Sequence, residues 1–240
     1  MEQERLDKIL SGTGRFSRNE TRRIIAAGLV TVDGAVVRRP EAKVSRRSEI
    51  TVKGETIDGA EFVYYMMNKP AGYVSASKPE GRYPAVTELL PEDLQKRGLF
   101  CAGRLDADVT GLLLLTDDGV FAHRVTAPRG EIPKTYRVKT DGPFSQADAD
   151  ALAAGTVLRG GVTYRPARLV IDAGDPAVGL VTVTEGKFHE VKNLLAVRDR
   201  RIRAMERISV GALSLDPGLA PGQYRRLTEE EAALCFASKC

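Results

Sequence analysis

The chain has 240 residues, of which 42% are hydrophobic and 28% charged, and a formal net charge of +4. That length allows one large domain, or a small domain joined to a medium one, with a core that needs no disulfide or metal. With no long apolar run and with charges from Glu2 onward, we expect neither a membrane span nor a secretory signal, and a cytoplasmic location. Three cysteines without CxxC spacing and only two histidines argue against a disulfide framework or a metal centre.

Two short helices are predicted at the start of the chain. Leu6, Ile9 and Leu10 lie at i, i+3, i+4 spacing and so share one face of a helix over about 4–12. A second helix is predicted over about 18–27, because a serine and a glutamate at its start have capping-box spacing and a glycine follows as a stop signal.

A β-hairpin is predicted next. Val30–Val32 and Ala35–Val37 flank an Asp-Gly pair, which tolerates the positive φ angles of a tight type I′ turn. Ile50–Val52 predicts a further strand, and this helix, helix, hairpin unit ends near Gly59.

Positive charge is concentrated in this first part, where residues 15–47 hold nine lysines or arginines against three acids. Steps of three and four residues put arginines on one side of the second helix. Such a face attracts phosphate, although a solvated surface helix has the same pattern. The arginines that we expect to contact RNA are Arg15, Arg18, Arg22, Arg23, Arg38 and Arg39, and the same patch continues through Lys43, Arg46 and Arg47.

From Phe62 onward the chain is rich in β-branched and aromatic residues separated by turns. Strands are predicted over 62–67, 112–115, 136–139 and 179–183, and helices over about 117–126, 145–154 and 187–197. Because strands and helices do not alternate regularly, the pattern predicts an α+β domain with a mainly antiparallel sheet. A second basic cluster either extends an RNA-binding surface or forms a solvated strand and turn; it contains Arg198, Arg200, Arg201, Arg203 and Arg207.

One carboxylate stands out. Asp106 lies shortly before Leu112–Leu115, whose uninterrupted leucines predict a strand buried on both faces. Functional acids often lie at the ends of such rigid elements, although an aspartate here can also serve only a backbone amide. Lys192, at the start of a predicted helix, is a candidate counter-charge that would keep a buried carboxylate ionised.

Five stretches of the chain resemble the pseudouridine synthases, in particular the small-subunit rRNA branch, and they follow one another in family order. They are Met67–Val74, Gly103–Leu112, Lys134–Tyr136, Glu185–Lys192 and Leu219–Thr228. The first part resembles an S4 RNA-binding domain through Arg5–Leu10, Ser17-Arg18 and Gly28–Gly34. The resemblance implies a small S4-like domain over 1–59 and a pseudouridine synthase domain over 60–240. Val109 departs from the family pattern, which usually has a threonine there.

The resemblance also implies the chemistry. Isomerising uridine to pseudouridine breaks the bond from ribose C1′ to N1, turns the base and joins C1′ to C5. Because no redox change or group donor takes part, no cofactor and no metal are expected. By correspondence Asp106 is the catalytic carboxylate, a nucleophile or a proton abstractor, and Tyr136 stacks on the target base. The residues expected to support the carboxylate or the pocket are Arg104, Lys192 and Leu195.

The expected substrate is small-subunit rRNA, free or in a partly assembled 30S particle, and the resemblance is greatest to enzymes for uridine 516 of 16S rRNA. A monomer is expected. Two alternatives stay open: a large-subunit (23S) rRNA pseudouridine synthase, and a catalytically silent S4-type ribosome-assembly factor. Asp106, Tyr136 and Lys192 together favour an enzyme, since binding alone needs none of them. A hydrolase using His189 is disfavoured because the chain lacks a G-x-S-x-G elbow.

Overall fold

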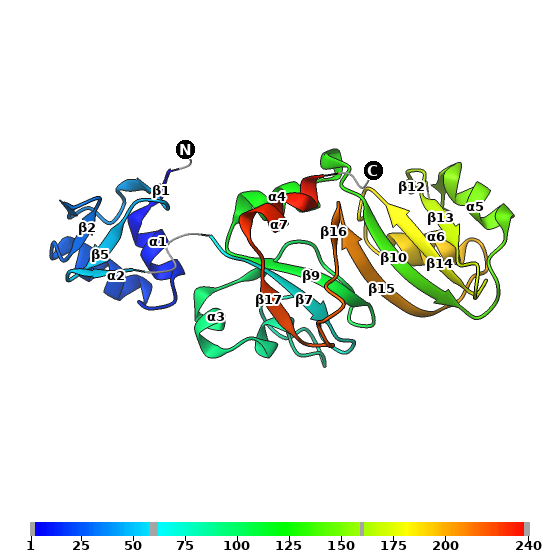
Figure 1. Ribbon diagram of the computed structural model, residues 1–240, viewed down its shortest axis with the longest axis horizontal. Coiled ribbons are helices and arrows are strands. Elements are labelled where there is room, and N and C mark those ends of the chain that lie inside the picture. Colours follow the sequence, from blue (N-terminus) through cyan, green and yellow to red (C-terminus); the bar gives the residue numbers. More distant parts are fainter. Residues whose placement is uncertain (1–2, 58–61, 159–160, 238–240) are drawn as a thin grey trace. The chain divides into compact units, whose positions relative to one another are not determined.

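The computed structural model describes residues 3–57, 62–158 and 161–237 (Figure 1). These residues form two compact units. The first comprises the described part of Met1–Val63 together with Thr87–Phe100 and Thr116–Asp118, and the second comprises the described remainder. The predicted domain boundary between residues 59 and 60 lies outside the described residues.

The first unit contains two helices, α1 (Leu6–Gly12) and α2 (Arg18–Ala26), whose apolar faces share a core with a four-stranded sheet. The sheet order is β3 (Ala35–Val37), β2 (Val30–Val32), β5 (Ile50–Val52) and β6 (Glu55–Thr56). The Ser17 half of the predicted cap is confirmed, because the Ser17 hydroxyl accepts a hydrogen bond from the Glu20 amide at 3.2 Å. The predicted hairpin is confirmed too, with φ of 50° at Asp33 and 80° at Gly34.

The first helix starts later than predicted, because Gln3–Arg5 is a strand, β1, that pairs with β4 (Lys43–Ser45). Within the same unit, α3 (Glu92–Arg97) contributes Arg97 to an ion pair with Asp117 at 2.9 Å. Asp117 also pairs with Arg46 at 3.4 Å, and all three side chains are more than 90% buried. Arg46 is therefore a structural residue, and the prediction that it extends an exposed basic patch is wrong.

A nine-stranded sheet dominates the second unit, in the order β13-β14-β10-β15-β9-β7-β17, with β16 added to β15 and β8 added to β9 (Figure 1). The strands are β7 (Tyr64–Lys69), β8 (Phe100–Cys101), β9 (Thr110–Thr116), β10 (Lys134–Thr140), β13 (Arg168–Ile171), β14 (Val178–Val183), β15 (Ile202–Val210), β16 (Leu213–Ser214) and β17 (Tyr224–Arg226). A short hairpin of β11 (Thr156–Val157) and β12 (Thr163–Tyr164) lies outside the sheet. The α-helices of this unit are α4 (Gly119–Thr126), α5 (Gln146–Ala153), α6 (Glu190–Ala196) and α7 (Glu229–Ala233). The predicted α+β class with a mainly antiparallel sheet is confirmed.

The leucine run is the buried strand that the sequence predicts. Leu112 to Leu115 are each at most 1% exposed, and because successive side chains on a strand point to opposite faces, both faces of β9 are covered. Leu112 and Leu114 share a core cluster with α4 and α7.

Three adjacent strands place the candidate site. Tyr136 of β10 is paired with Arg207 of β15, and Arg207 is paired in parallel with Gly111 of β9. At Gly111 φ is +97°, and a Cβ there would lie 2.4 Å from the Arg207 carbonyl oxygen, so only glycine allows this close approach. The turn that precedes β9, which carries Asp106, is thereby held beside β15. No helix in the described part of the chain is long and apolar enough to cross a membrane.

Candidate active site

Asp106 sits on a turn that is tied to its surroundings at several backbone atoms. The Val109 amide donates to the Asp106 carbonyl oxygen at 3.1 Å and closes the turn. The fully buried Lys69 ammonium donates to the Val109 carbonyl oxygen at 2.7 Å. On the other side, the Ser75 hydroxyl donates to the Leu105 carbonyl oxygen at 2.8 Å and accepts from the Leu105 amide at 2.9 Å. The carboxylate is therefore mounted on a rigid turn.

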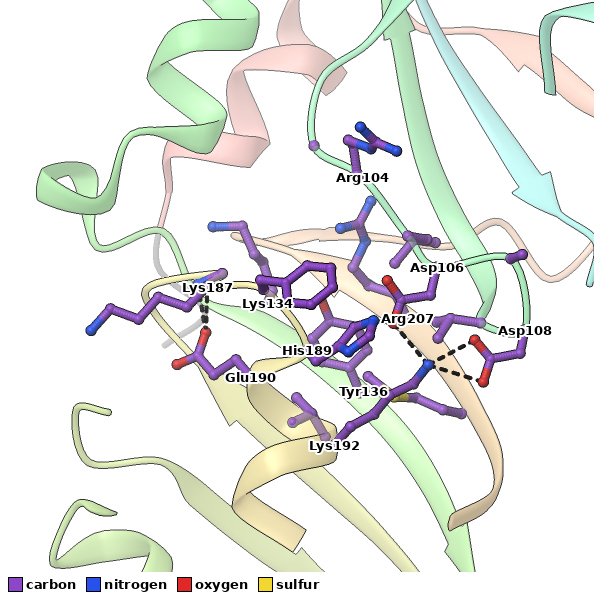
Figure 2. Close-up of a pocket in the computed structure, with 18 of the residues that line it drawn as sticks. Arg104, Asp106, Asp108, Lys134, Tyr136, Lys187, His189, Glu190, Lys192 and Arg207 are labelled. Carbon is purple, nitrogen blue, oxygen red and sulfur yellow. Dashed lines mark hydrogen bonds and ion pairs between the residues drawn. The ribbon is translucent and has the colours of Figure 1, made fainter. Parts of the chain in front are cut away.

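The carboxylate meets two side chains from the start of α6 (Figure 2). Lys192 Nζ lies 2.8 Å from Asp106 Oδ2, and His189 Nε2 lies 3.2 Å from the same oxygen. Lys192 also bridges to Asp108, with its Nζ 2.7 Å from Oδ1 and 2.9 Å from Oδ2. The contact between Asp106 and Lys192, which the sequence left open, is present.

The charges around Lys192 and Asp108 favour the ionised form of both side chains. Burial alone would lower the pKa of Lys192, but its hydrogen bonds to Asp106 and Asp108 outweigh burial and raise the pKa above its ordinary value. Burial likewise acts to raise the pKa of Asp108, and the Lys192 ammonium overcomes it and lowers that pKa. Lys192 is therefore a permanent cation across the neutral range, next to Asp106.

Asp106 borders a cavity of about 850 Å³, a size typical of small-molecule sites. Its wall contains Tyr136, which is 7% exposed, and its rim contains Arg104, which is exposed and pairs with Glu80 at 3.0 Å. The structure thus brings together four of the residues predicted from the sequence: Asp106, Arg104, Tyr136 and Lys192.

Leu195 does not join them. It is fully buried and is not among the residues that line the cavity, because only the first turn of α6 reaches the cavity while Leu194 and Leu195, further along the helix, are buried. Leu195 thus makes no part of the cavity lining, and its expected role as a support of the pocket stays a prediction. The predicted helix over 187–197 also starts later, at Glu190, since His189 has a left-handed φ of 52°.

Sequence reasoning missed two buried cations on the cavity wall. Lys134 is 5% exposed, donates to the Ile132 carbonyl oxygen at 3.0 Å, and has a pKa lowered to about 8 by burial. Arg207 is 2% exposed and its Nε donates to the Leu112 carbonyl oxygen at 2.8 Å. Arg207 is therefore no member of a solvated basic cluster. The one signal available in the sequence was the place of Arg207 in an alternating strand. Alternation does not reveal what covers either face of a strand.

Two further arginines of the second basic cluster form ion pairs within the protein. Arg198 and Arg200 pair with Asp148, at 3.3 Å and 2.7 Å, and this carboxylate is almost completely buried. In the first unit, by contrast, all six arginines expected to contact RNA are exposed: Arg15, Arg18, Arg22, Arg23, Arg38 and Arg39. Arg22 lies 3.5 Å from Asp7.

Comparison with known proteins identifies the family. A family model described as RNA pseudouridylate synthase matches residues 63–197, and an S4 domain model matches residues 4–50. The uncharacterized RNA pseudouridine synthase YtzG of Bacillus subtilis is 42% identical over 234 residues, which cover 96% of this chain and 97% of that protein. Ribosomal small subunit pseudouridine synthase A of Escherichia coli (strain K12) is 37% identical over 231 residues, with coverage of 95% and 98%.

A solved structure described as a pseudouridylate synthase has a TM-score of 0.68 to this fold, with 33% identity, and covers 97% of this chain and 99% of its own. These matches extend over both the S4-like region and the cavity that holds Asp106. The chain therefore belongs to the RNA pseudouridine synthase family, with an S4 domain ahead of its catalytic domain.

Proposed function

We propose that this protein isomerises one uridine of small-subunit rRNA to pseudouridine, with Asp106 as the catalytic carboxylate. Relatives in Escherichia coli and Pasteurella multocida that are named ribosomal small subunit pseudouridine synthase A support the choice of rRNA. The observation that carries the residue assignment is the placement of Asp106, a partly exposed carboxylate on a braced turn of the cavity wall, paired with a cation at 2.8 Å.

Each neighbour of the carboxylate has a defined task in this proposal. Lys192 places a cation 2.8 Å from Asp106 Oδ2 and so positions the carboxylate for attack at C1′ or for proton abstraction from the ribose. Tyr136 offers a flat aromatic surface on which the uracil is held and then turned. Arg104, exposed at the rim, is placed to contact a phosphate of the incoming nucleotide.

The target uridine is out of reach while it is stacked in RNA, so it must swing out into the cavity. Extrusion costs a few kcal/mol, which contacts to the RNA backbone and stacking in the pocket offset. The exposed arginines of the S4 domain are proposed to supply part of the backbone contact, because phosphate contacts provide most of the affinity of such proteins. We further propose uridine 516 of 16S rRNA as the target, free rRNA or a partly assembled 30S particle as the substrate form, and a monomer in the cytoplasm as the active species.

The test is to incubate unmodified 16S and 23S rRNA, and 30S precursor particles, with the protein and to map pseudouridine by carbodiimide-dependent primer extension. We expect one new stop in 16S rRNA with the wild type and none with Asp106→Asn, while RNA affinity is unchanged. Asp150→Asn is a matched control, because Asp150 is exposed on α5 and its carboxylate accepts a hydrogen bond from Gln146 on the same helix.

The outcomes separate the alternatives. Modification of 23S rRNA alone would replace the proposed target with the large-subunit one. No pseudouridine in any rRNA substrate would favour a silent assembly factor. Full activity of Asp106→Asn would refute the role assigned to the carboxylate.

A further inference from the structure

A large aromatic side chain is exposed at the cavity. Phe188, in the loop between β14 and α6, lines the cavity and is 79% exposed, the highest value among the exposed large hydrophobic side chains of the described residues. The ring therefore offers an exposed aromatic surface on the same cavity wall as Asp106, on which a nucleic-acid base can stack.

Within the described part of the chain, the Phe188 ring stacks on a neighbouring imidazole. Its centroid lies 3.7 Å from that of the His189 imidazole, with 22° between the planes. His189 in turn places Nε2 at 3.2 Å from Asp106 Oδ2 (Figure 2). One face of the phenyl ring is therefore covered by an imidazole that contacts the carboxylate, while most of the remaining ring surface faces solvent.

The loop holds this pair in a fixed arrangement. The backbone of His189 adopts a left-handed φ of 52°, which is uncommon for residues other than glycine. Its side chain makes no capping hydrogen bond for α6. The buried carboxylate of Glu190 accepts hydrogen bonds from the Gly186 amide at 2.6 Å and from the Lys187 amide at 3.0 Å. The backbone before α6 is thus constrained, and the constraint directs the imidazole at Asp106.

The surroundings of the ring favour nucleic acid over protein. Lys187, Lys192 and Arg104 line the same cavity, each paired with a carboxylate of the wall, so the exposed ring is surrounded by charged rather than apolar side chains. Proteins that bind single-stranded nucleic acid combine positive charge along the backbone with aromatic rings on which bases stack. A hydrophobic protein partner would instead require an apolar surface around the ring.

We propose that Phe188 stacks against the base next to the target uridine and fills the position that the uridine vacates when it swings into the cavity. The base, Phe188 and His189 then form a three-ring stack that ends at Asp106, which sets the distance of the RNA from the carboxylate. This inference rests on the proposed function in one respect, namely that RNA binds in the cavity. It makes Phe188 a positioning residue and His189 the support of its ring.

The test compares Phe188→Leu, which removes the ring but keeps an apolar side chain, with Phe188→Trp, which keeps a stacking surface. A 16S rRNA fragment carries 2-aminopurine beside the target uridine, because stacking quenches the fluorescence of this base. We expect Phe188→Leu to lose the quench and to raise KM about tenfold, with a smaller change in kcat. Phe188→Trp should retain both values.

A matched control is Val170→Ala, since Val170 is 43% exposed on β13 and lies outside the cavity wall. It should behave as the wild type. The inference would be overturned if Phe188→Leu showed the quench and the KM of the wild type. It would also be overturned if Phe188→Leu and Phe188→Trp lost the quench and raised KM to the same extent. The fluorescence quench reports stacking in the bound RNA whether or not pseudouridine forms. A wild-type protein that modifies no rRNA would therefore refute the proposed function, and the quench would still test the stacking on Phe188.

Discussion

Replacing Lys192 with methionine isolates the contribution of the cation beside Asp106. Lys192 Nζ lies 2.8 Å from Asp106 Oδ2 and 2.7 Å from Asp108 Oδ1, so the substitution leaves two neighbouring carboxylates without their shared counter-charge. Hydrogen bonds between charged groups contribute about 1.5–3 kcal/mol. Because the Lys192 and Asp106 side chains are 26% and 33% exposed, solvent screening places the loss near the lower limit.

A loss of about 1.5–2 kcal/mol corresponds to roughly a 10- to 30-fold decrease in kcat/KM. The decrease should fall mainly on kcat, since Lys192 contacts the reacting carboxylate. Release of tritium from an rRNA fragment labelled at uridine C5 measures it, with Lys139→Met as control because Lys139 forms an exposed ion pair with Asp175. Lys192→Arg should recover part of the activity.

The sign of the pH dependence follows from the directions of the two shifts. The pKa of Lys192 is raised, so its stabilising contribution is complete below the ordinary lysine pKa and is lost as pH rises through the raised value. The pKa of Asp108 is lowered, so its contribution is complete above the ordinary aspartate pKa and is lost as pH falls through the lowered value. The difference in unfolding free energy between wild type and Lys192→Met should therefore be constant from about pH 5 to pH 9. A kcat/KM of Lys192→Met within twofold of the wild type would refute the reasoning.

Three further substitutions test other parts of the molecule. Tyr136→Leu should weaken binding of the rRNA fragment about tenfold in a filter-binding assay, while Tyr136→Phe keeps the stacking surface and the affinity. Replacing Arg18 and Arg22 with alanine should reduce the slope of log affinity against log salt by about one to two, and an unchanged slope would exclude them from phosphate contact. Gly111→Ala should lower the free energy of unfolding in urea by more than about 2 kcal/mol, because the new Cβ would lie 2.4 Å from a backbone oxygen of β15. Gly222→Ala, at φ +86° but in open space, should cost about 1 kcal/mol and separates backbone strain from collision.

The elements that could be predicted are those specified by local chemistry. The Asp-Gly pair alone determines the turn between β2 and β3, and Ser17 alone caps α2. The four leucines of β9 indicate burial on both faces without any knowledge of what covers them. Asp106 and Lys192 could be proposed from the leucine strand and from a predicted helix start, whereas Tyr136 is singled out by a short stretch that resembles a family motif.

The features that could not be predicted from the sequence arise where strands far apart in the chain pair with each other. The parallel pairing of β9 with β15 joins Gly111 to Arg207, nearly a hundred residues away, and no local pattern announces it. The same pairing buries Arg207, which looks from the sequence like one of several solvated arginines. Lys134 is hidden in the same way, because an alternating strand reveals which residues share a face but not which face is covered.

The site combines side chains from three segments that lie far apart in the sequence. The turn before β9 provides the carboxylate, β10 provides the aromatic wall, and the first turn of α6 provides the cation and the imidazole. All three belong to the second unit, whereas the exposed arginines belong to the first. Under the proposed function, we therefore expect the arginines of the S4 domain to act on the affinity for RNA and Lys192 to act on the rate of the bound complex.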